Sequence, residues 1–199
     1  MKNLKIYSLD ISAATEDEFT LWYSQMSEEK KLAADRLQNK EKRLSKIAAD
    51  ALCRKAVSEN CGIPCNEIIF GTAEKGKPFA VNAEIRFNVS HSGKMVVCAV
   101  CDKEIGIDIE KIRTVNPGAA ERFATESEID YINSEADGFF KIWTLKEAYF
   151  KCIGTGLGAD IKSVSFNISE NEIICSEQGF DCFFKEIADG YICSVCIKN

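Results

Sequence analysis

Two carboxylates separated by a single residue are the sharpest chemical feature of the sequence. In residues 105–110 (Ile-Gly-Ile-Asp-Ile-Glu), isoleucines alternate with Gly106, Asp108 and Glu110. A strand with this pattern buries the isoleucines and holds both carboxylates on the opposite face, about 7 Å apart. Parallel carboxylates need a cation, and oxygen ligands without imidazole or thiolate favour Mg²⁺ or Mn²⁺ over zinc. A solvent-exposed acidic face on an edge strand explains the hexapeptide equally well.

A third carboxylate lies on a helix predicted over residues 138–153. Glu147 is placed well away from the apolar face of this helix and one turn before Lys151. The two side chains fit an ordinary surface ion pair. They also fit a third oxygen ligand or general base, with Lys151 facing a phosphate, and helical spacing alone does not favour this second interpretation. The face predicted to be buried consists of Ile142, Leu145, Tyr149 and Cys152.

His91 is the only histidine of the chain, and it lies between Ser90 and Ser92 where a predicted strand runs into a turn. A single imidazole excludes any site built from several histidines. Taken alone, a histidine flanked by serines is more typical of a hydrogen-bonded turn than of a binding site.

The charge of the chain is unevenly distributed. The 199 residues carry a net charge of −6, but residues 30–55 contain nine basic and three acidic side chains, a local charge of +6. The remainder of the chain is therefore at −12. A basic helical segment in an acidic protein is usually a solvated face, and a polyanionic ligand is the more specific interpretation. Composition does not decide between the two.

The composition is that of a soluble globular protein of one or two domains, with 46% hydrophobic and 28% charged residues and three prolines. The longest apolar run, residues 95–101, is far shorter than the roughly 20 residues of a membrane helix. The first ten residues lack the apolar core of a signal peptide. We therefore expect a cytoplasmic protein.

The ten cysteines are expected to be reduced and to pack as small apolar residues, because the cytoplasm is a reducing compartment. Two Cys-x-x-Cys pairs, Cys98/Cys101 and Cys193/Cys196, lie in β-branched segments typical of buried strands. Positions three apart on a strand face opposite sides. Neither pair can therefore bind one metal ion without a turn.

The elements that must position these residues follow a repeated order, helices and then strands, twice along the chain. A first strand is predicted at residues 5–9, and helical periodicity follows over residues 15–60, with breaks near Ser27 and Asn39. The later elements are strands at 67–71, 86–89, 95–101 and 105–110, helices at 118–134 and 138–153, and strands at 163–168, 172–175, 182–187 and 191–197.

This order predicts an α+β fold with two comparable lobes, residues 1–104 and residues 105–199. The sheets are expected to be largely antiparallel, with helices packed on them. No clear internal repeat is visible in the sequence itself, so the two-lobe division rests on the order of the elements.

Together and in this order, the motifs closely resemble the 4'-phosphopantetheinyl transferase superfamily, in its larger single-chain form of the surfactin-synthetase-activating type. The resemblance covers roughly residues 70–158, and the ends of the chain match in length and element order only. The small trimeric carrier-protein synthases of the superfamily are much shorter, so length selects the two-lobed form. The matching motifs are residues 88–92 (Asn-Val-Ser-His-Ser), 106–110 (Gly-Ile-Asp-Ile-Glu) and 143–148 (Trp-Thr-Leu-Lys-Glu-Ala) with Lys151, supported by residues 75–78 (Lys-Gly-Lys-Pro).

The resemblance implies a pseudodimer of two similar α/β lobes with coenzyme A in the cleft between them. It implies transfer of the 4'-phosphopantetheine arm of coenzyme A to a serine of an apo acyl carrier protein or peptidyl carrier domain, with release of adenosine 3',5'-bisphosphate. Such carriers serve fatty-acid, polyketide or nonribosomal peptide biosynthesis. Asp108, Glu110 and Glu147 match the family's Mg²⁺ ligands, with Mn²⁺ as an alternative metal. Glu147 also matches the base for the carrier serine, and Lys151 matches the lysine near the pyrophosphate.

Contacts with coenzyme A are implied as well. Ser90 and His91 match residues that hold its phosphates, and residues 76–78 match the segment beside the adenine. The family places basic residues within positions 30–55, which gives the local charge of +6 a purpose. The implied coenzyme A residues are Lys30, Arg43, Lys46, Gly76, Lys77, Pro78, Ser90 and His91.

The carrier is expected to dock beside the helix after Glu110, where Lys111, Arg113 and Arg122 could meet acidic carrier residues. We expect a monomer with neither nucleic acid nor a membrane as partner. Two other hypotheses use the same acidic cluster. A metal-dependent hydrolase of nucleotide diphosphates would cleave coenzyme A without a carrier, and a non-catalytic coenzyme A binding protein would bind it without turnover.

Overall fold

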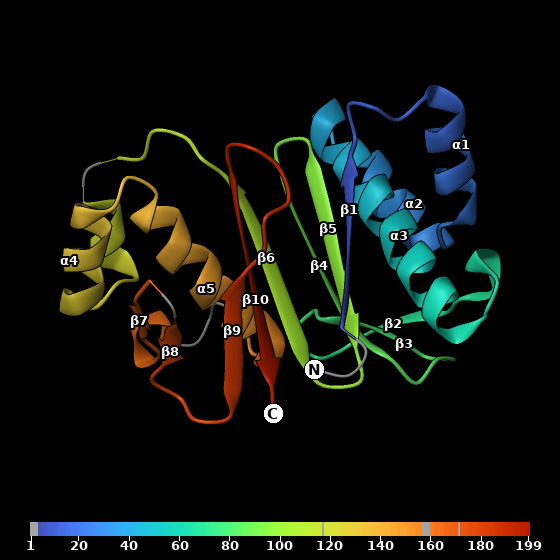
Figure 1. Ribbon diagram of the computed structural model, residues 1–199. Coiled ribbons are helices and arrows are strands. Elements are labelled where there is room, and N and C mark those ends of the chain that lie inside the picture. Colours follow the sequence, from blue (N-terminus) through green and yellow to red (C-terminus); the bar gives the residue numbers. More distant parts are fainter. Residues whose placement is uncertain (1–3, 117, 157–159, 171) are drawn as a thin grey trace.

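The computed structural model of the protein has two lobes, whose sheets lie together in the centre and whose helices cover the outer sides (Figure 1). It describes residues 4–116, 118–156, 160–170 and 172–199. The expected α+β class and antiparallel strand pairing are confirmed. Within the described ranges, no helix is both long enough and apolar enough to cross a bilayer.

In its described residues, the N-terminal lobe contains one strand, three α-helices, a short 3₁₀ helix and two strand pairs. Thr15, Ser27 and Asn39 each accept a hydrogen bond from a backbone N–H at the start of a helix, so the breaks predicted near Ser27 and Asn39 are confirmed. The elements are β1 (Lys5–Asp10), α1 (Glu16–Gln25), α2 (Glu28–Asp35), α3 (Lys40–Cys61), the 3₁₀ helix η1 (Cys65–Glu67), β2 (Phe70–Thr72), β3 (Pro78–Ala80), β4 (Arg86–Ser92) and β5 (Met95–Cys101).

The C-terminal lobe repeats this order with shorter helices. The helix predicted over residues 118–134 begins later than expected, because the Thr125 N–H donates to the Glu128 side chain at 2.8 Å and caps the helix there. The elements are β6 (Ile105–Lys111), η2 (Ala119–Arg122), α4 (Glu126–Ser134), α5 (Gly138–Ile153), η3 (Ile161–Ser163), β7 (Phe166–Ile168), β8 (Ile173–Cys175), β9 (Phe180–Phe184) and β10 (Tyr191–Lys198).

The two lobes share one sheet topology. In each, the first strand pairs with the last, and the last pairs with the strand before it, giving the orders β1-β5-β4 and β6-β10-β9. Each lobe also carries a two-stranded hairpin after its long helix, β2-β3 in one and β7-β8 in the other. The expected pseudodimer is therefore present in the topology, although the sequence shows no repeat.

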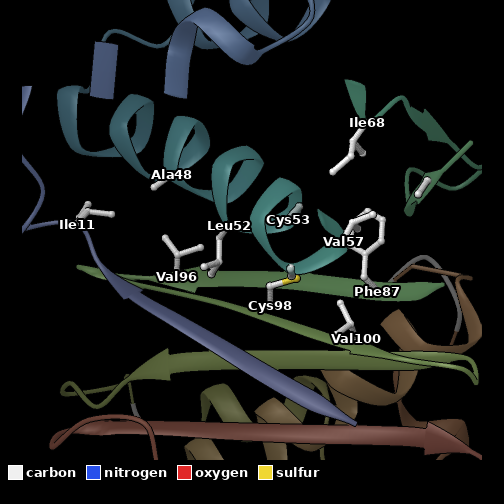
Figure 2. Packing of buried hydrophobic residues seen from close by; sticks show 12 residues of the cluster. Ile11, Ala48, Leu52, Cys53, Val57, Ile68, Phe87, Val96, Cys98 and Val100 are labelled. Carbon is white, nitrogen blue, oxygen red and sulfur yellow. The ribbon is translucent and has the colours of Figure 1, made fainter. Parts of the chain in front are cut away.

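Apolar clusters build each lobe and join the two. Helix α3 covers the outer face of its sheet, where Leu52 packs with Val96 (Figure 2). Helix α5 covers the other sheet in the same way. Between the sheets, a third cluster mixes residues of both lobes, including Val97 of β5, Ile107 of β6 and Val195 of β10. The lobes therefore share a core and support each other.

The Cys-x-x-Cys pairs are arranged as expected. Cys98 packs under α3 while Cys101 faces the other lobe, and Cys193 and Cys196 also face opposite sides of their strand. The expectation that all cysteines are reduced is wrong, because Cys196 forms a disulfide with Cys182, its direct neighbour on β9. The two cysteines are 14 positions apart in the sequence, and only the pairing of β9 with β10 brings them together.

Candidate active site

The carboxylates of β6 are held by serines of the adjacent strand β4. Ser90 Oγ donates a hydrogen bond to Asp108 Oδ1 at 2.7 Å, and Ser92 Oγ donates one to Glu110 Oε2 at 2.8 Å. The two serines are two positions apart on their strand, and so are the two carboxylates on theirs. Side chains with this spacing point to the same side of a strand, so each serine meets one carboxylate. The isoleucines of β6 face the shared core instead, which confirms the alternation predicted from the sequence.

Gly106 allows helix α5 to lie very close to β6. A Cβ atom at this position would be 1.9 Å from the Ala148 carbonyl oxygen and 2.4 Å from the Cys152 backbone nitrogen, both in α5. A side chain there would therefore overlap the helix backbone. The close approach brings Lys151 Nζ to 2.5 Å from Asp108 Oδ1. Asp108 is thus bound from β4 on one side and from α5 on the other.

Glu147 is half-buried on α5. Burial raises its pKa to about 7; the Lys151 ammonium counteracts this, while the charges of Asp108 and Glu110 add to it. Burial also raises the pKa of Asp108, against the lowering effect of Lys151 and of the hydrogen bond from Ser90. The helix thus brings Glu147 within electrostatic range of the other two carboxylates.

Asp108, Glu110 and Glu147 offer oxygen atoms of the kind that could hold a divalent cation. Asp108 Oδ2 is buried and has no hydrogen-bond partner within the described part of the chain. A buried oxygen without a partner is unfavourable, and a bound cation would satisfy it. As the side chains stand, Lys151 and Arg113 neutralise Asp108 and Glu110. No three acidic, histidine or cysteine side chains of the described residues are gathered closely enough to share a metal ion. The oxygen donors fit Mg²⁺ or Mn²⁺, which would require side-chain rearrangement.

A pocket of about 290 Å³ in the N-terminal lobe contains several of the expected coenzyme A residues. Lys30 of α2 and Lys46 of α3 line it from one side, and Gly76 and Pro78 from the other. The ammonium of Lys30 lies 4.2 Å from the centre of the Phe70 ring, which also lines the pocket. An aromatic ring and two lysines in one lining suit a ligand that combines a planar base with phosphate.

A buried ion pair supports one wall of this pocket. The Asp50 carboxylate binds Lys30 and also accepts a hydrogen bond from Arg54 Nε at 2.7 Å. Arg54 Nη1 in turn donates to the carbonyls of Cys65 and Ile68, each at 2.9 Å. Sequence analysis missed Asp50 and Arg54. Their four-residue spacing on a helix is a signal of pairing, but it does not reveal that both are buried.

His91 stands at the end of β4, within range of both the pocket and the carboxylates. Although its ring is exposed at the surface, the protein atoms packed around it lower its pKa, and the ammonium groups of Lys151 and Lys46 lower it further. Asp108 and Glu110 act in the opposite direction. The pocket and the acidic cluster meet on β4, because Val89 lines the pocket and the next residue, Ser90, donates to Asp108.

Four of the eight expected coenzyme A residues, Arg43, Lys77, Ser90 and His91, lie outside the pocket lining. Arg43 pairs with Asp35 at 2.7 Å on the exposed surface of the α2–α3 region, outside the described lining of the pocket. The side chain of Lys77 turns away from the pocket that its neighbours line and binds Glu104 at 2.9 Å. Spacing along the chain cannot show either orientation.

Lys146, the neighbour of Glu147, is fully buried in an ion pair with Glu128 of α4 at 2.9 Å. Its ammonium also donates to the carbonyls of Ile161 and Val164. This lysine therefore joins α4, α5 and the segment before β7 rather than facing a substrate. Sequence analysis assigned it no role, since a single lysine on a helix is usually exposed.

Comparisons with known proteins identify the family of the chain. The family described as the 4'-phosphopantetheinyl transferase superfamily matches residues 104–196, and the one described as 4'-phosphopantetheinyl transferase, N-terminal, matches residues 13–103. The chain is 34% identical to 4'-phosphopantetheinyl transferase gsp of Aneurinibacillus migulanus, over 89% of this chain and 78% of the relative. It is 30% identical to 4'-phosphopantetheinyl transferase Sfp of Bacillus subtilis (strain 168), over 98% of this chain and 93% of the relative. The chain belongs to the 4'-phosphopantetheinyl transferase superfamily.

Proposed function

We propose that this protein transfers the 4'-phosphopantetheine arm of coenzyme A to a serine of an apo carrier protein, in one active site formed by the N-terminal pocket and the carboxylates of β6 and α5. The observation that carries the proposal is the arrangement around Asp108. Ser90 of β4 and Lys151 of α5 meet at this carboxylate. The relatives named as 4'-phosphopantetheinyl transferases support the same reaction.

Coenzyme A is the donor substrate, and we assign its nucleotide part to the pocket. Gly76 and Pro78 would contact the adenine, and Lys30 and Lys46 would bind the 3'-phosphate. Arg43 could join them only after it releases Asp35. The pyrophosphate would then extend toward Ser90 and His91, which follow the pocket residue Val89 on β4.

The reaction forms a bond between the serine oxygen of the carrier and the β-phosphorus of coenzyme A. It breaks the bond from that phosphorus to the oxygen of the leaving adenosine 3',5'-bisphosphate. Glu147 takes the proton of the serine hydroxyl and so acts as the general base of the reaction. Lys151 places a positive charge beside the pyrophosphate, where negative charge develops.

We propose Asp108, Glu110 and Glu147 as the residues that would hold Mg²⁺ or Mn²⁺. A divalent cation supplies neutralising charge for the pyrophosphate oxygens. The hydrogen bonds from Ser90 and Ser92 orient two of these carboxylates, which is the usual role of residues behind metal ligands.

We place the carrier protein beside the loop that follows β6. Arg113 is bound to Glu110 and keeps more than half of its side chain exposed, and Lys111 and Arg122 are exposed nearby in the sequence. These positive charges suit an acidic carrier surface and would mainly accelerate encounter. We further propose that the protein acts as a cytoplasmic monomer with lobes 1–104 and 105–199, without a nucleic acid or membrane partner.

The test is to incubate the protein with coenzyme A, Mg²⁺ and apo carrier proteins from several pathways, and to weigh the carriers by mass spectrometry. A mass gain equal to the phosphopantetheine arm is expected on at least one carrier, and the Glu147→Gln variant should lose it. Coenzyme A cleavage without a carrier would instead indicate the hydrolase. Binding of coenzyme A with no turnover in any assay would indicate a non-catalytic binding protein.

A further inference from the structure

Lys77 connects the coenzyme pocket of one lobe to the catalytic helix of the other. Its side chain is 15% exposed, and its ammonium donates to Glu104 Oε2 and to the Cys152 carbonyl oxygen, each at 2.9 Å. Cys152 lies in the last turn of α5, directly after Lys151. A positive charge at the carboxyl end of a helix is also favourable to the helix dipole.

The other end of this connection is the loop between β2 and β3. Gly76 and Pro78, the immediate neighbours of Lys77, both line the pocket. Lys77 itself turns in the opposite direction, toward Glu104 at the junction of the lobes. Glu104 is held there by Arg86 Nε, which binds its Oε1 atom at 2.9 Å, and by the Cys152 thiol, which donates to its backbone carbonyl at 3.2 Å. One side chain therefore anchors the pocket wall to the helix that carries Glu147.

We propose that Lys77 is a positioning residue that sets the spacing between the nucleotide pocket and the pair Glu147 and Lys151. The inference rests on the proposed function, because coenzyme A would have to reach from the pocket to α5. Coenzyme A bound by one lobe, and assisted in its reaction by the base and the lysine of the other, is sensitive to this spacing, and an error of about 1 Å can cost roughly a hundredfold in rate.

A direct contact between Lys77 and a phosphate of the nucleotide is the competing account. The two accounts differ in the role they give to Glu104, which does not line the pocket within the described residues. If Lys77 positions the loop, loss of Glu104 weakens the same connection. If Lys77 binds the nucleotide directly, loss of Glu104 leaves the coenzyme site intact.

The experiment compares Lys77→Met, Glu104→Ala and the double variant, with Lys75→Met as the matched control. Lys75 is an exposed lysine of the same loop, outside the pocket lining, so its loss changes the charge equally. We expect Lys77→Met to raise the KM for coenzyme A and lower kcat, with a combined loss of roughly tenfold or more in kcat/KM. Glu104→Ala should give a smaller loss of the same kind, and the double variant should be no worse than Lys77→Met. Lys75→Met should stay within about twofold of the wild type.

The inference would be wrong if Lys77→Met left kcat/KM for coenzyme A unchanged. It would also be wrong if Lys77→Met lowered kcat/KM while Glu104→Ala left it unchanged, or if the losses of the two single variants simply added in the double variant. Amide hydrogen exchange tests the connection without any activity. Lys77→Met should accelerate exchange in the loop around residue 76 and in the last turn of α5, but not in α3. Absence of transfer by the wild-type protein would refute the proposed function while leaving this measurement valid, and unchanged exchange would refute the connection.

Discussion

The two carboxylate oxygens of Asp108 have different surroundings. Its Oδ1 atom accepts hydrogen bonds from Ser90 and Lys151, while its Oδ2 atom is buried without a partner among the described residues. The hydrogen bonds to Oδ1 orient the carboxylate. The Oδ2 atom remains available for a cation, which is the property that a metal ligand requires.

Replacing Asp108 by Asn should lower turnover by roughly a hundredfold or more, because the amide keeps the size of the side chain but removes the charge that binds a cation. The fold should survive, and its melting temperature should stay close to that of the wild type. Carrier modification measured by mass spectrometry gives the rate. The exposed Asp130 of α4 offers a control, and Asp130→Asn should transfer at the wild-type rate. A normal rate in Asp108→Asn would remove this residue from the site.

The raised pKa of Glu147 predicts a pH-dependent stability. Its ordinary value is 4.5 and its value in the fold is about 7, so the folded protein holds this proton more tightly than the unfolded chain. In EDTA, stability should therefore fall as the pH rises from about 4.5 to about 7. Glu147→Gln removes this contribution. The melting temperature of the variant minus that of the wild type should therefore be larger at pH 8 than at pH 5. An equal difference at both pH values would contradict the assigned shift.

At the scale of elements, the contact between β6 and α5 determines whether the site exists. One glycine permits the contact, and a buried ion pair on the far side of the helix supports it. Gly106 lies under the backbone of α5, and Lys146 ties α5 to α4 through Glu128. Neither residue touches the carboxylates directly, yet both decide where Glu147 stands.

Gly106→Ala should destabilise the protein by about 1–3 kcal/mol or more, because its methyl group would collide with the Ala148 carbonyl of α5. The helix must move away from β6, so Lys151 loses its contact with Asp108 and activity falls even where the fold persists. Urea unfolding measures the stability, and carrier modification measures the activity. A variant with wild-type values in both assays would show that the two elements are not in tight contact.

Lys146→Met should cost about 3–5 kcal/mol, since it leaves the Glu128 carboxylate buried without its cation. The double variant Lys146→Met with Glu128→Gln should recover a large part of this loss, because the unpaired charge is then absent. Chemical denaturation of the two variants provides the comparison. If the double variant is less stable than Lys146→Met alone, the two side chains do not act as a pair.

At the scale of the whole molecule, the lobes are joined by an apolar cluster to which both contribute. Val97 belongs to the N-terminal lobe, while Ile107 and Val195 belong to the C-terminal lobe, and all three are fully buried. Separating the lobes would expose this surface to water, at a cost of about 25 cal/mol for each Å² of apolar area.

The fragments 1–104 and 105–199 should therefore not fold independently, and they should form a native-like complex when they are expressed together. Circular dichroism, binding of a hydrophobic dye and size-exclusion chromatography of the separate and combined fragments provide the test. Cooperative thermal unfolding of either fragment as an isolated monomer would show that the shared cluster is dispensable.

The sequence by itself determined those features that depend on local periodicity. Alternation on β6 placed Asp108 and Glu110 on one face, helix-capping residues marked Ser27 and Asn39 as helix starts, and the order of elements indicated two lobes. Such patterns are readable because a strand repeats every two residues and a helix every 3.6, whatever surrounds them. The motifs were also sufficient to indicate the family.

Only the tertiary structure decided which distant side chains meet. It paired Cys182 with Cys196, directed Lys77 toward Glu104 instead of the pocket, and placed Arg43 outside the pocket lining in the described part of the chain. These outcomes depend on strand register and on the orientation of long, flexible side chains. A lysine or arginine can reach in several directions from the same backbone position, and the packing of neighbouring elements selects one of them.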